Sequence, residues 1–291
     1  MNGILIVDKP MDWTSFDVIA KLRGILGTRK LGHSGTLDPM ATGVLPVFAG
    51  VASKAVDMQP NHDKTYCAVL RFGLCTDTGD VTGTVLETSN QKVTKQQLLE
   101  VLPRFTGDIM QTPPMYSAVK INGTPLYKLA RQGVTVERKA RPVTIYRLDL
   151  LEQSGEQDFV LEVACSKGTY VRTLVEDLGE ALGVPATLAG LRRTQAGVFD
   201  LQHSHTLEEI QAAKDAGTLE QLFVPVETVF AHLPQITVNE QNKMRLFNGA
   251  PCYRFQQPDG VYRLYSGEEF LGLGKIQNTQ LKAEKLFVER T

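Results

Sequence analysis

The segment of this chain whose residue types best suit chemistry is residues 32–46, GHSGTLDPMATGVLP. Its only ionisable side chains are His33 and Asp38, and Pro39 biases Asp38 towards an extended backbone. The glycines of the segment let the chain turn sharply and approach a ligand closely. A rigid loop that presents one carboxylate predicts a residue that attacks a substrate or holds a charge. Taken alone, an Asp-Pro pair also fits an ordinary turn or a helix N-cap.

The segments on both sides of this loop read as regular elements that hold it in place. Residues 4–7 form an apolar run typical of a buried strand, and Thr14 or Ser15 begins a helix that Gly27 ends. The predicted apolar face of this helix comprises Phe16, Ile19, Leu22 and Leu26. After the loop, alternate apolar positions predict a strand with Tyr66, Ala68, Leu70 and Phe72 on one face.

The middle of the chain contains a second candidate working region. Residues 107–142 are rich in Pro, Gly, Lys and Arg with little periodicity, which predicts an insertion at a binding face. Strands are expected at 143–151 and 159–166, and residues 166–169 are expected to supply the turn and cap before a helix. The predicted apolar stripe of that helix comprises Val171, Leu174, Val175, Leu178 and Leu182. Beyond residue 230, short alternating segments separated by turns predict a small β-rich domain.

Composition limits the class of protein. The chain has 291 residues, 42% of them hydrophobic, which allows one large and one small domain with a sizeable core. No apolar run approaches the ~20 residues of a membrane span, no signal region opens the chain, and the four scattered cysteines fit a reducing cytoplasm. The net charge of −1 argues against indiscriminate nucleic-acid coating, but the basic residues are clustered, which suits one phosphate-bearing ligand such as folded RNA. The clusters are Lys21 to Lys30, Lys128 to Arg147, and Arg192 with Arg193; ordinary solvated surface is the alternative interpretation.

The Asp38 loop resembles the catalytic signature of the RNA pseudouridine synthases, specifically the bacterial tRNA pseudouridine-55 synthases. The family pattern there is Gly-His-Thr/Ser-Gly-Thr/Ala-Leu-Asp-Pro followed by Ala-Thr-Gly-Val-Leu-Pro. Further segments agree in order and spacing, so that the resemblance covers residue 3 to about residue 200. These segments are GILIVDKP (3–10) with WTS (13–15), KTY (64–66), TPPMYSAVK (112–120) and KGTYVRTL (167–174).

The resemblance implies an activity and a set of site residues. Asp38 is implied to be the catalytic carboxylate and Arg172 the cation that pairs with it, since an unpaired buried charge is very costly. Tyr66 and Tyr170 match base-contacting tyrosines, Leu191 matches a position that lines the uracil pocket, and His33 is implied to fill the space left by the extruded nucleotide. The corresponding structural alternatives are a core tyrosine, a core leucine, a surface arginine and a turn histidine.

The sequence therefore predicts an α+β fold: a catalytic domain with a mixed, largely antiparallel sheet and flanking helices (1–221), a linker (222–233), and a small β-barrel-like, RNA-binding domain (234–291). The expected reaction is isomerisation of uridine 55 in the TΨC stem-loop of tRNA by a cytoplasmic monomer. No cofactor is expected, because the isomerisation needs no redox change or energy input. No metal, membrane, guide RNA or obligate protein partner is expected either. A non-catalytic tRNA-folding protein is one alternative. A glycoside hydrolase is another, although such enzymes usually need a second acid.

Overall fold

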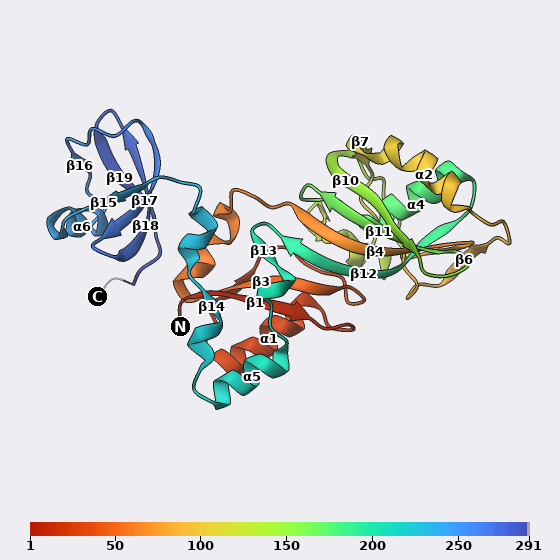
Figure 1. Ribbon diagram of the computed structural model, residues 1–291, viewed down its shortest axis with the longest axis horizontal. Coiled ribbons are helices and arrows are strands. Elements are labelled where there is room, and N and C mark those ends of the chain that lie inside the picture. Colours follow the sequence, from red (N-terminus) through yellow and green to blue (C-terminus); the bar gives the residue numbers. More distant parts are fainter. Residues whose placement is uncertain (290–291) are drawn as a thin grey trace.

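We describe a computed structural model of the protein, in which residues 1–289 are placed. Its largest element is a ten-stranded sheet whose main path runs β14-β1-β3-β12-β4-β11-β10-β7, with β2 and β13 pairing at the side (Figure 1). All its strand pairs are antiparallel except β12–β3, so the predicted mixed, largely antiparallel sheet is confirmed. The strands are β1 (Gly3–Lys9), β2 (Leu31–His33), β3 (Thr42–Ala49), β4 (Lys64–Phe72), β7 (Gly107–Gln111), β10 (Arg141–Gln153), β11 (Asp158–Cys165), β12 (Ala186–Ala196), β13 (Phe199–Asp200) and β14 (Phe223–Val224).

The helices cover this sheet in two groups. α1 (Ser15–Leu26) and α5 (Leu207–Asp215) share one core with β1 and β3, while α2 (Lys95–Val101) and α4 (Val171–Leu182) pack on β4, β10 and β11. The 3-10 turns are η1 (Gly50–Met58), η2 (Leu102–Phe105), η3 (Leu201–His203), η4 (Leu219–Leu222) and η5 (Val226–Phe230), and a small hairpin joins β5 (Leu74–Thr76) to β6 (Val85–Thr88). This α+β arrangement confirms the predicted fold class.

The helix after β1 begins and ends as predicted, but its buried face differs. Thr14 caps it, in a capping box with Asp17, and Gly27 ends it in the left-handed conformation. Phe16, expected on the apolar face, is 64% exposed. Val18 and Ile25 are buried instead, because the helix turns a face centred between Ile19 and Leu22 onto the sheet.

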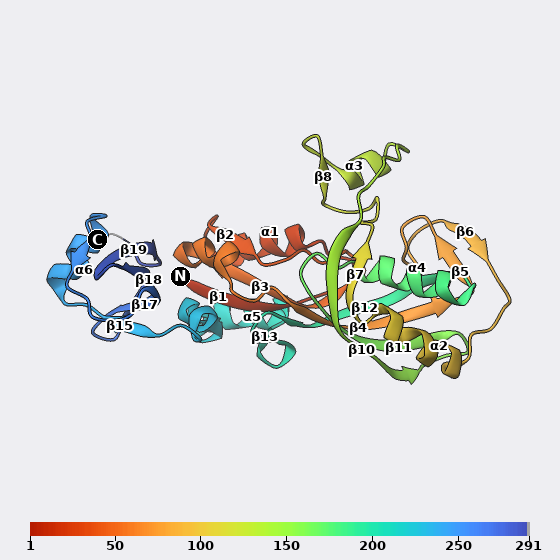
Figure 2. The same cartoon turned by 90° about the horizontal axis from the view of Figure 1, so that it is seen from above.

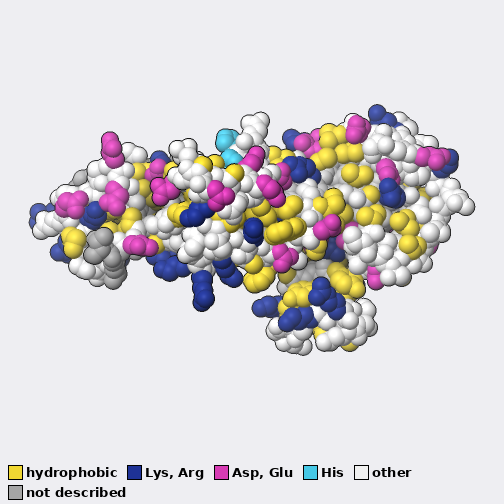
Figure 3. Space-filling view, turned by 90° about the horizontal axis from the view of Figure 1, so that it is seen from below, with side chains coloured by type: hydrophobic (Ala, Val, Ile, Leu, Met, Phe, Trp, Pro, Cys, Tyr) yellow, Lys and Arg dark blue, Asp and Glu magenta, His cyan; other side chains and the backbone are white. Residues whose placement is uncertain are grey.

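The expected insertion is shorter than residues 107–142, since Gly107–Gln111 and Arg141 onward are sheet strands. The segment between them projects away from the sheet and carries β8 (Lys120–Ile121), β9 (Thr124–Pro125) and α3 (Leu126–Ala130) (Figure 2). Lys and Arg side chains gather on this segment (Figure 3), which contains Lys128, Arg131, Arg138 and Lys139. Two other arginines of the predicted basic clusters already form ion pairs within the protein: Arg147 pairs with Glu162, and Arg192 pairs with Asp8.

The C-terminal part forms a curled five-stranded sheet, ordered β15-β17-β18-β19-β16. Its elements are β15 (Gln235–Thr237), α6 (Glu240–Phe247), β16 (Cys252–Tyr253), β17 (Gly260–Ser266), β18 (Glu269–Gln277) and β19 (Gln280–Leu286). α6 was not foreseen, although Asn239 caps it. The segment 222–233 does more than connect the two sheets: Phe223 and Val224 pair with β1, and Val229 and Phe230 join a core with Phe287. None of the helices in residues 1–289 has the length and apolar character to span a membrane.

Candidate active site

The loop that carries Asp38 is held to the sheet and to α1 from three directions. The buried Lys9 ammonium, at the end of β1, donates to the carbonyl oxygens of Pro10, Trp13 and Pro39. The Ser15 hydroxyl, in the first turn of α1, accepts from the Leu37 amide at 2.9 Å. These contacts lie on both sides of Asp38 and fix where its carboxylate points.

Arg193 is the third anchor of this loop, and it is fully buried. It lies opposite Tyr66 in the β12–β4 register, so both side chains extend from the same face of the sheet. Its Nε donates to the carbonyl of Val44 at 2.7 Å and its Nη2 to that of Gly35 at 3.1 Å. The sequence predicts Arg193 as part of a basic surface, and its burial shows that this prediction is wrong. Arg193 is two residues from Leu191, and alternation along a strand puts both side chains on the same face. This spacing was the signal in the sequence that Arg193 is buried.

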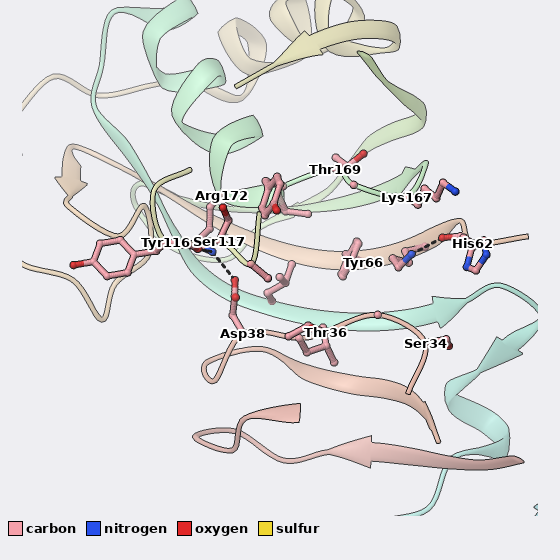
Figure 4. A pocket seen from close by; sticks show the side chains of 18 residues that line it. Ser34, Thr36, Asp38, His62, Tyr66, Tyr116, Ser117, Lys167, Thr169 and Arg172 are labelled. Atoms are coloured by element: carbon pink, nitrogen blue, oxygen red, sulfur yellow. Dashed lines mark hydrogen bonds and ion pairs between the residues drawn. The ribbon is translucent and has the colours of Figure 1, made fainter. Parts of the chain in front are cut away.

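Arg172 meets Asp38 from the other side of the site, at the start of α4. Its Nη2 lies 3.0 Å from Asp38 Oδ2, and the exposed side-chain fractions are 5% for Arg172 and 39% for Asp38 (Figure 4). The guanidinium also donates to the carbonyls of Thr78 and Tyr116, both at 2.8 Å. Burial raises the pKa of the Asp38 carboxyl, and the adjacent guanidinium of Arg172 opposes that rise.

The start of α4 is stabilised differently from the expectation. Tyr170 is the N-cap residue and its own side chain makes no capping bond; Thr169 bonds back to the Ser166 carbonyl. The buried side chain of Gln111, on β7, instead accepts from the Tyr170 amide at 2.7 Å and donates to its carbonyl at 3.1 Å. A residue distant in sequence therefore fixes the turn that delivers Arg172.

The Asp38–Arg172 pair opens into a cavity of about 400 Å³ between the loop, β4, the projecting segment and the start of α4. Of the residues that the sequence predicted, Asp38, Tyr66, Tyr170, Arg172 and Leu191 all line it. Lining residues that the site prediction did not include are Ser34, Gly35, Thr36, Leu37, His62, Lys64, Tyr116, Ser117, Ala118, Lys167, Gly168, Thr169 and Val171. Asp38 is the one carboxylate among the lining residues in the part of the chain that the structure describes.

Two expected residues have more particular positions. Tyr66 is buried on β4, and burial raises the pKa of its hydroxyl while the Arg193 charge opposes this. His33, at the end of β2, lies outside the set of described residues that line the cavity. Its Nδ1 is buried without a hydrogen-bond partner within residues 1–289, and burial lowers the pKa of the ring. This favours the neutral imidazole.

The Asp80 carboxylate accepts hydrogen bonds from the hydroxyls of Thr78 and Thr82 and from the Thr82 amide. It therefore shapes the turn whose Thr78 carbonyl holds Arg172. Across residues 1–289 there is no grouping of three or more His, Cys, Asp or Glu side chains suited to a metal ion.

Comparison with known proteins agrees with this fold. Residues 23–171 match the family described as TruB family pseudouridylate synthase (N terminal domain), and residues 172–231 match the tRNA pseudouridylate synthase B C-terminal domain. The structure also resembles a chain in the crystal structure of a Cbf5-Nop10-Gar1 complex, with a TM-score of 0.74 and 26% identity, over 99% of this chain and 85% of that one. The class of protein is therefore that of the pseudouridine synthases, which are isomerases.

Relatives identify the branch of that class. The tRNA pseudouridine synthase B of Dechloromonas aromatica (strain RCB) is 46% identical over 275 residues, covering 94% of this chain and 91% of the relative. The protein of the same name from Azoarcus sp. (strain BH72) is 42% identical over 291 residues, covering 100% and 96%. The chain belongs to the TruB family of pseudouridine synthases.

Proposed function

We propose that this protein converts uridine 55, in the TΨC arm of tRNA, into pseudouridine. The N1–C1′ bond breaks, the base turns, and a C5–C1′ bond forms; C5 loses a proton and N1 gains one, so the reaction is balanced without a cofactor. The observation that carries the proposal is the Asp38 carboxylate, which pairs with the buried Arg172 and faces a cavity lined in part by the Tyr66 ring. The names of its relatives support tRNA as the substrate.

In this proposal each site residue has a separate task. Asp38 acts at C1′ or C6 of the uridine, and Arg172 keeps its carboxylate ionised although burial disfavours the charge. The Tyr66 ring stacks on the base, with Tyr170 and Leu191 completing the wall that retains the detached uracil. A second acid, which a glycoside hydrolase usually needs, is absent from the lining among the described residues.

A target uridine stacked in an RNA loop must leave the stack before Asp38 can reach it, at a cost of a few kcal/mol. We assign His33 to the space that the extruded nucleotide vacates, which offsets part of this cost. The basic projecting segment and the C-terminal sheet are proposed to hold the RNA by its shape and phosphates, in a monomer that acts without guide RNA. The domain limits proposed for these tasks are 1–221 for catalysis, 222–233 for the connection and 234–291 for the C-terminal domain.

Release of tritium from C5 of uridine in a tRNA transcript tests the proposal, because C5 loses its hydrogen only when the base is rejoined there. We expect release by the wild type and none by Asp38→Asn, which retains tRNA binding. Binding without release by the wild type would favour a tRNA-folding protein. Equal release by both proteins would remove Asp38 from the mechanism.

A further inference from the structure

Three basic side chains line the end of the cavity that lies away from the Asp38–Arg172 pair. His62 and Lys64 are at the start of β4, and Lys167 follows β11. Figure 4 places Tyr66 between the Asp38–Arg172 pair on one side and His62 and Lys167 on the other. The proposed isomerisation gives roles to the Asp38–Arg172 pair and to Tyr66. It gives none to the basic end of the cavity.

The strand pairing brings the three side chains together. β4 and β11 are antiparallel, with Lys64 opposite Cys165. His62 and Lys167 each lie two residues beyond this last pair, and both line the cavity. The Lys64 stem lies under the catalytic loop: a Cβ added to Gly35 would be 3.2 Å from Lys64 Cε and 3.9 Å from its Nζ. The loop backbone thus confines the Lys64 ammonium to the wall of the cavity.

None of these three side chains forms an ion pair with a carboxylate in the described part of the chain. The nearby Asp63 carboxylate accepts a hydrogen bond from the Tyr146 hydroxyl. The Lys64 ammonium donates to the His62 carbonyl, which leaves N–H groups for a ligand.

The electrostatics of the cluster favour an incoming anion. Burial lowers the pKa of Lys64, and the charges of Arg193 and Lys167 lower it further, against the opposing effect of Asp63. Burial also lowers the pKa of His62, followed by the charges of Lys64 and Lys167. The repulsion between like charges in the free protein is relieved when a negative group binds between them.

The spacing matches a nucleotide bound at Tyr66. Lys64 and Tyr66 are two residues apart on one strand, so their side chains extend from the same face about 7 Å apart. A base stacked on Tyr66 carries its own backbone with it when it leaves the RNA stack. Its neighbouring phosphates then lie at the edge of the cavity, where Lys64 and Lys167 are.

We propose that His62, Lys64 and Lys167 bind one of the two backbone phosphates that flank the target uridine. This inference rests on the proposed function, since it places the uridine base on Tyr66. The contact is independent of base sequence and serves to position the flipped nucleotide against Asp38. It uses the same binding energy before and during the reaction, and so acts on KM more than on kcat.

The test uses a chemically synthesised TΨC stem-loop RNA with C5-tritiated uridine at the target position. Two further RNAs carry a neutral methylphosphonate in place of the phosphate on the 5′ side or on the 3′ side of that uridine. The variants are Lys64→Gln and Lys167→Gln, the latter at an exposed residue that tolerates substitution. The control, Lys214→Gln, removes an exposed lysine from the last turn of α5, outside the cavity.

On the unmodified RNA we expect each cavity variant to raise KM about tenfold at physiological salt, with kcat within about threefold of wild type. The slope of the logarithm of the binding constant against the logarithm of the salt concentration becomes less steep by about 0.7, because one contact to single-stranded RNA is lost. The wild type is expected to bind one of the methylphosphonate RNAs about as weakly as the cavity variants bind the unmodified RNA. On that same modified RNA the variants are expected to lose no further affinity. The proposal would be overturned if the lysine variants lost as much affinity on both modified RNAs as on the unmodified RNA. It would also be overturned if Lys214→Gln lost as much affinity as the cavity variants.

Failure of the phosphate site and failure of the proposed function give different results. Tritium release by the wild type from unmodified RNA tests the function alone. Equilibrium binding of the same three RNAs tests the phosphate site even without turnover. Circular dichroism and thermal unfolding identify any variant that does not fold, and Lys64→Arg, which keeps the charge, is then expected to restore most of the affinity.

Discussion

Replacing Arg172 with Met tests how the site keeps its carboxylate charged. The guanidinium pairs with Asp38 at 3.0 Å and donates to the carbonyls of Thr78 and Tyr116 at 2.8 Å each. Methionine fills a similar volume but leaves both carbonyls unpaired, at about 1 kcal/mol each. Asp38 is 39% exposed and can be hydrated, so the full 3–5 kcal/mol of a broken buried pair is not reached. We expect a loss of unfolding free energy of about 2–3 kcal/mol.

The effect on activity follows from Coulomb's law. Two unit charges 3.0 Å apart attract by roughly 1.4–2.8 kcal/mol at an effective dielectric constant of about 80 to 40, which suits a pair whose carboxylate is reached by solvent. Without this attraction the pKa of the Asp38 carboxyl, which burial already raises, rises further. Since the proposed mechanism needs an ionised Asp38, the acid limb of the pH–activity profile moves to higher pH.

The assay is kcat/KM for C5-tritium release between pH 5 and pH 8. Arg172→Lys is the matched control: it keeps the positive charge but cannot reproduce the planar fork that serves both carbonyls. Its acid limb is expected near that of the wild type although its stability falls. An acid limb in folded Arg172→Met that coincides with the wild type would refute the electrostatic role of Arg172.

Three other substitutions test the supports of the site. Gln111→Leu removes both bonds to the Tyr170 backbone and is expected to cost about 1–2 kcal/mol in urea unfolding and to lower kcat; an unchanged kcat would contradict its positioning role. Lys9→Met leaves the carbonyls of Pro10, Trp13 and Pro39 without their donor, and a loss of about 2 kcal/mol in the same assay is expected; equal stability would mean that the cost of burying the ammonium cancels these bonds. Burial and Glu180 raise the pKa of Asp177 to about 6. Because this acid binds its proton more tightly when folded, the ionised form destabilises the fold above pH 6 and the penalty vanishes below about pH 4. Asp177→Asn therefore gains about 1 kcal/mol in thermal unfolding at pH 7 and nothing at pH 4; an equal gain at both would exclude ionisation as the cause.

The sequence predicts best what depends on neighbours along the chain. Capping residues and the apolar period locate α1, and the apolar period locates α4, because these signals act within a few residues. The failures concern contacts between distant segments. Nothing near Tyr170 indicates that Gln111 caps it, because that contact forms only when β7 joins the sheet edge. The exposed position of Phe16 likewise depends on which side of α1 meets the sheet.

The same limit applies to charge. Arg172, Arg193 and Lys64 are all simply basic in the sequence, yet the fold gives them three different functions. Arg172 is satisfied by one carboxylate and two carbonyls, and Arg193 is enclosed beneath the loop that carries Asp38. Lys64 retains a charge that no carboxylate in residues 1–289 contacts. A net charge of −1 is therefore compatible with an RNA substrate, because affinity depends on which cations the fold leaves without a counter-charge.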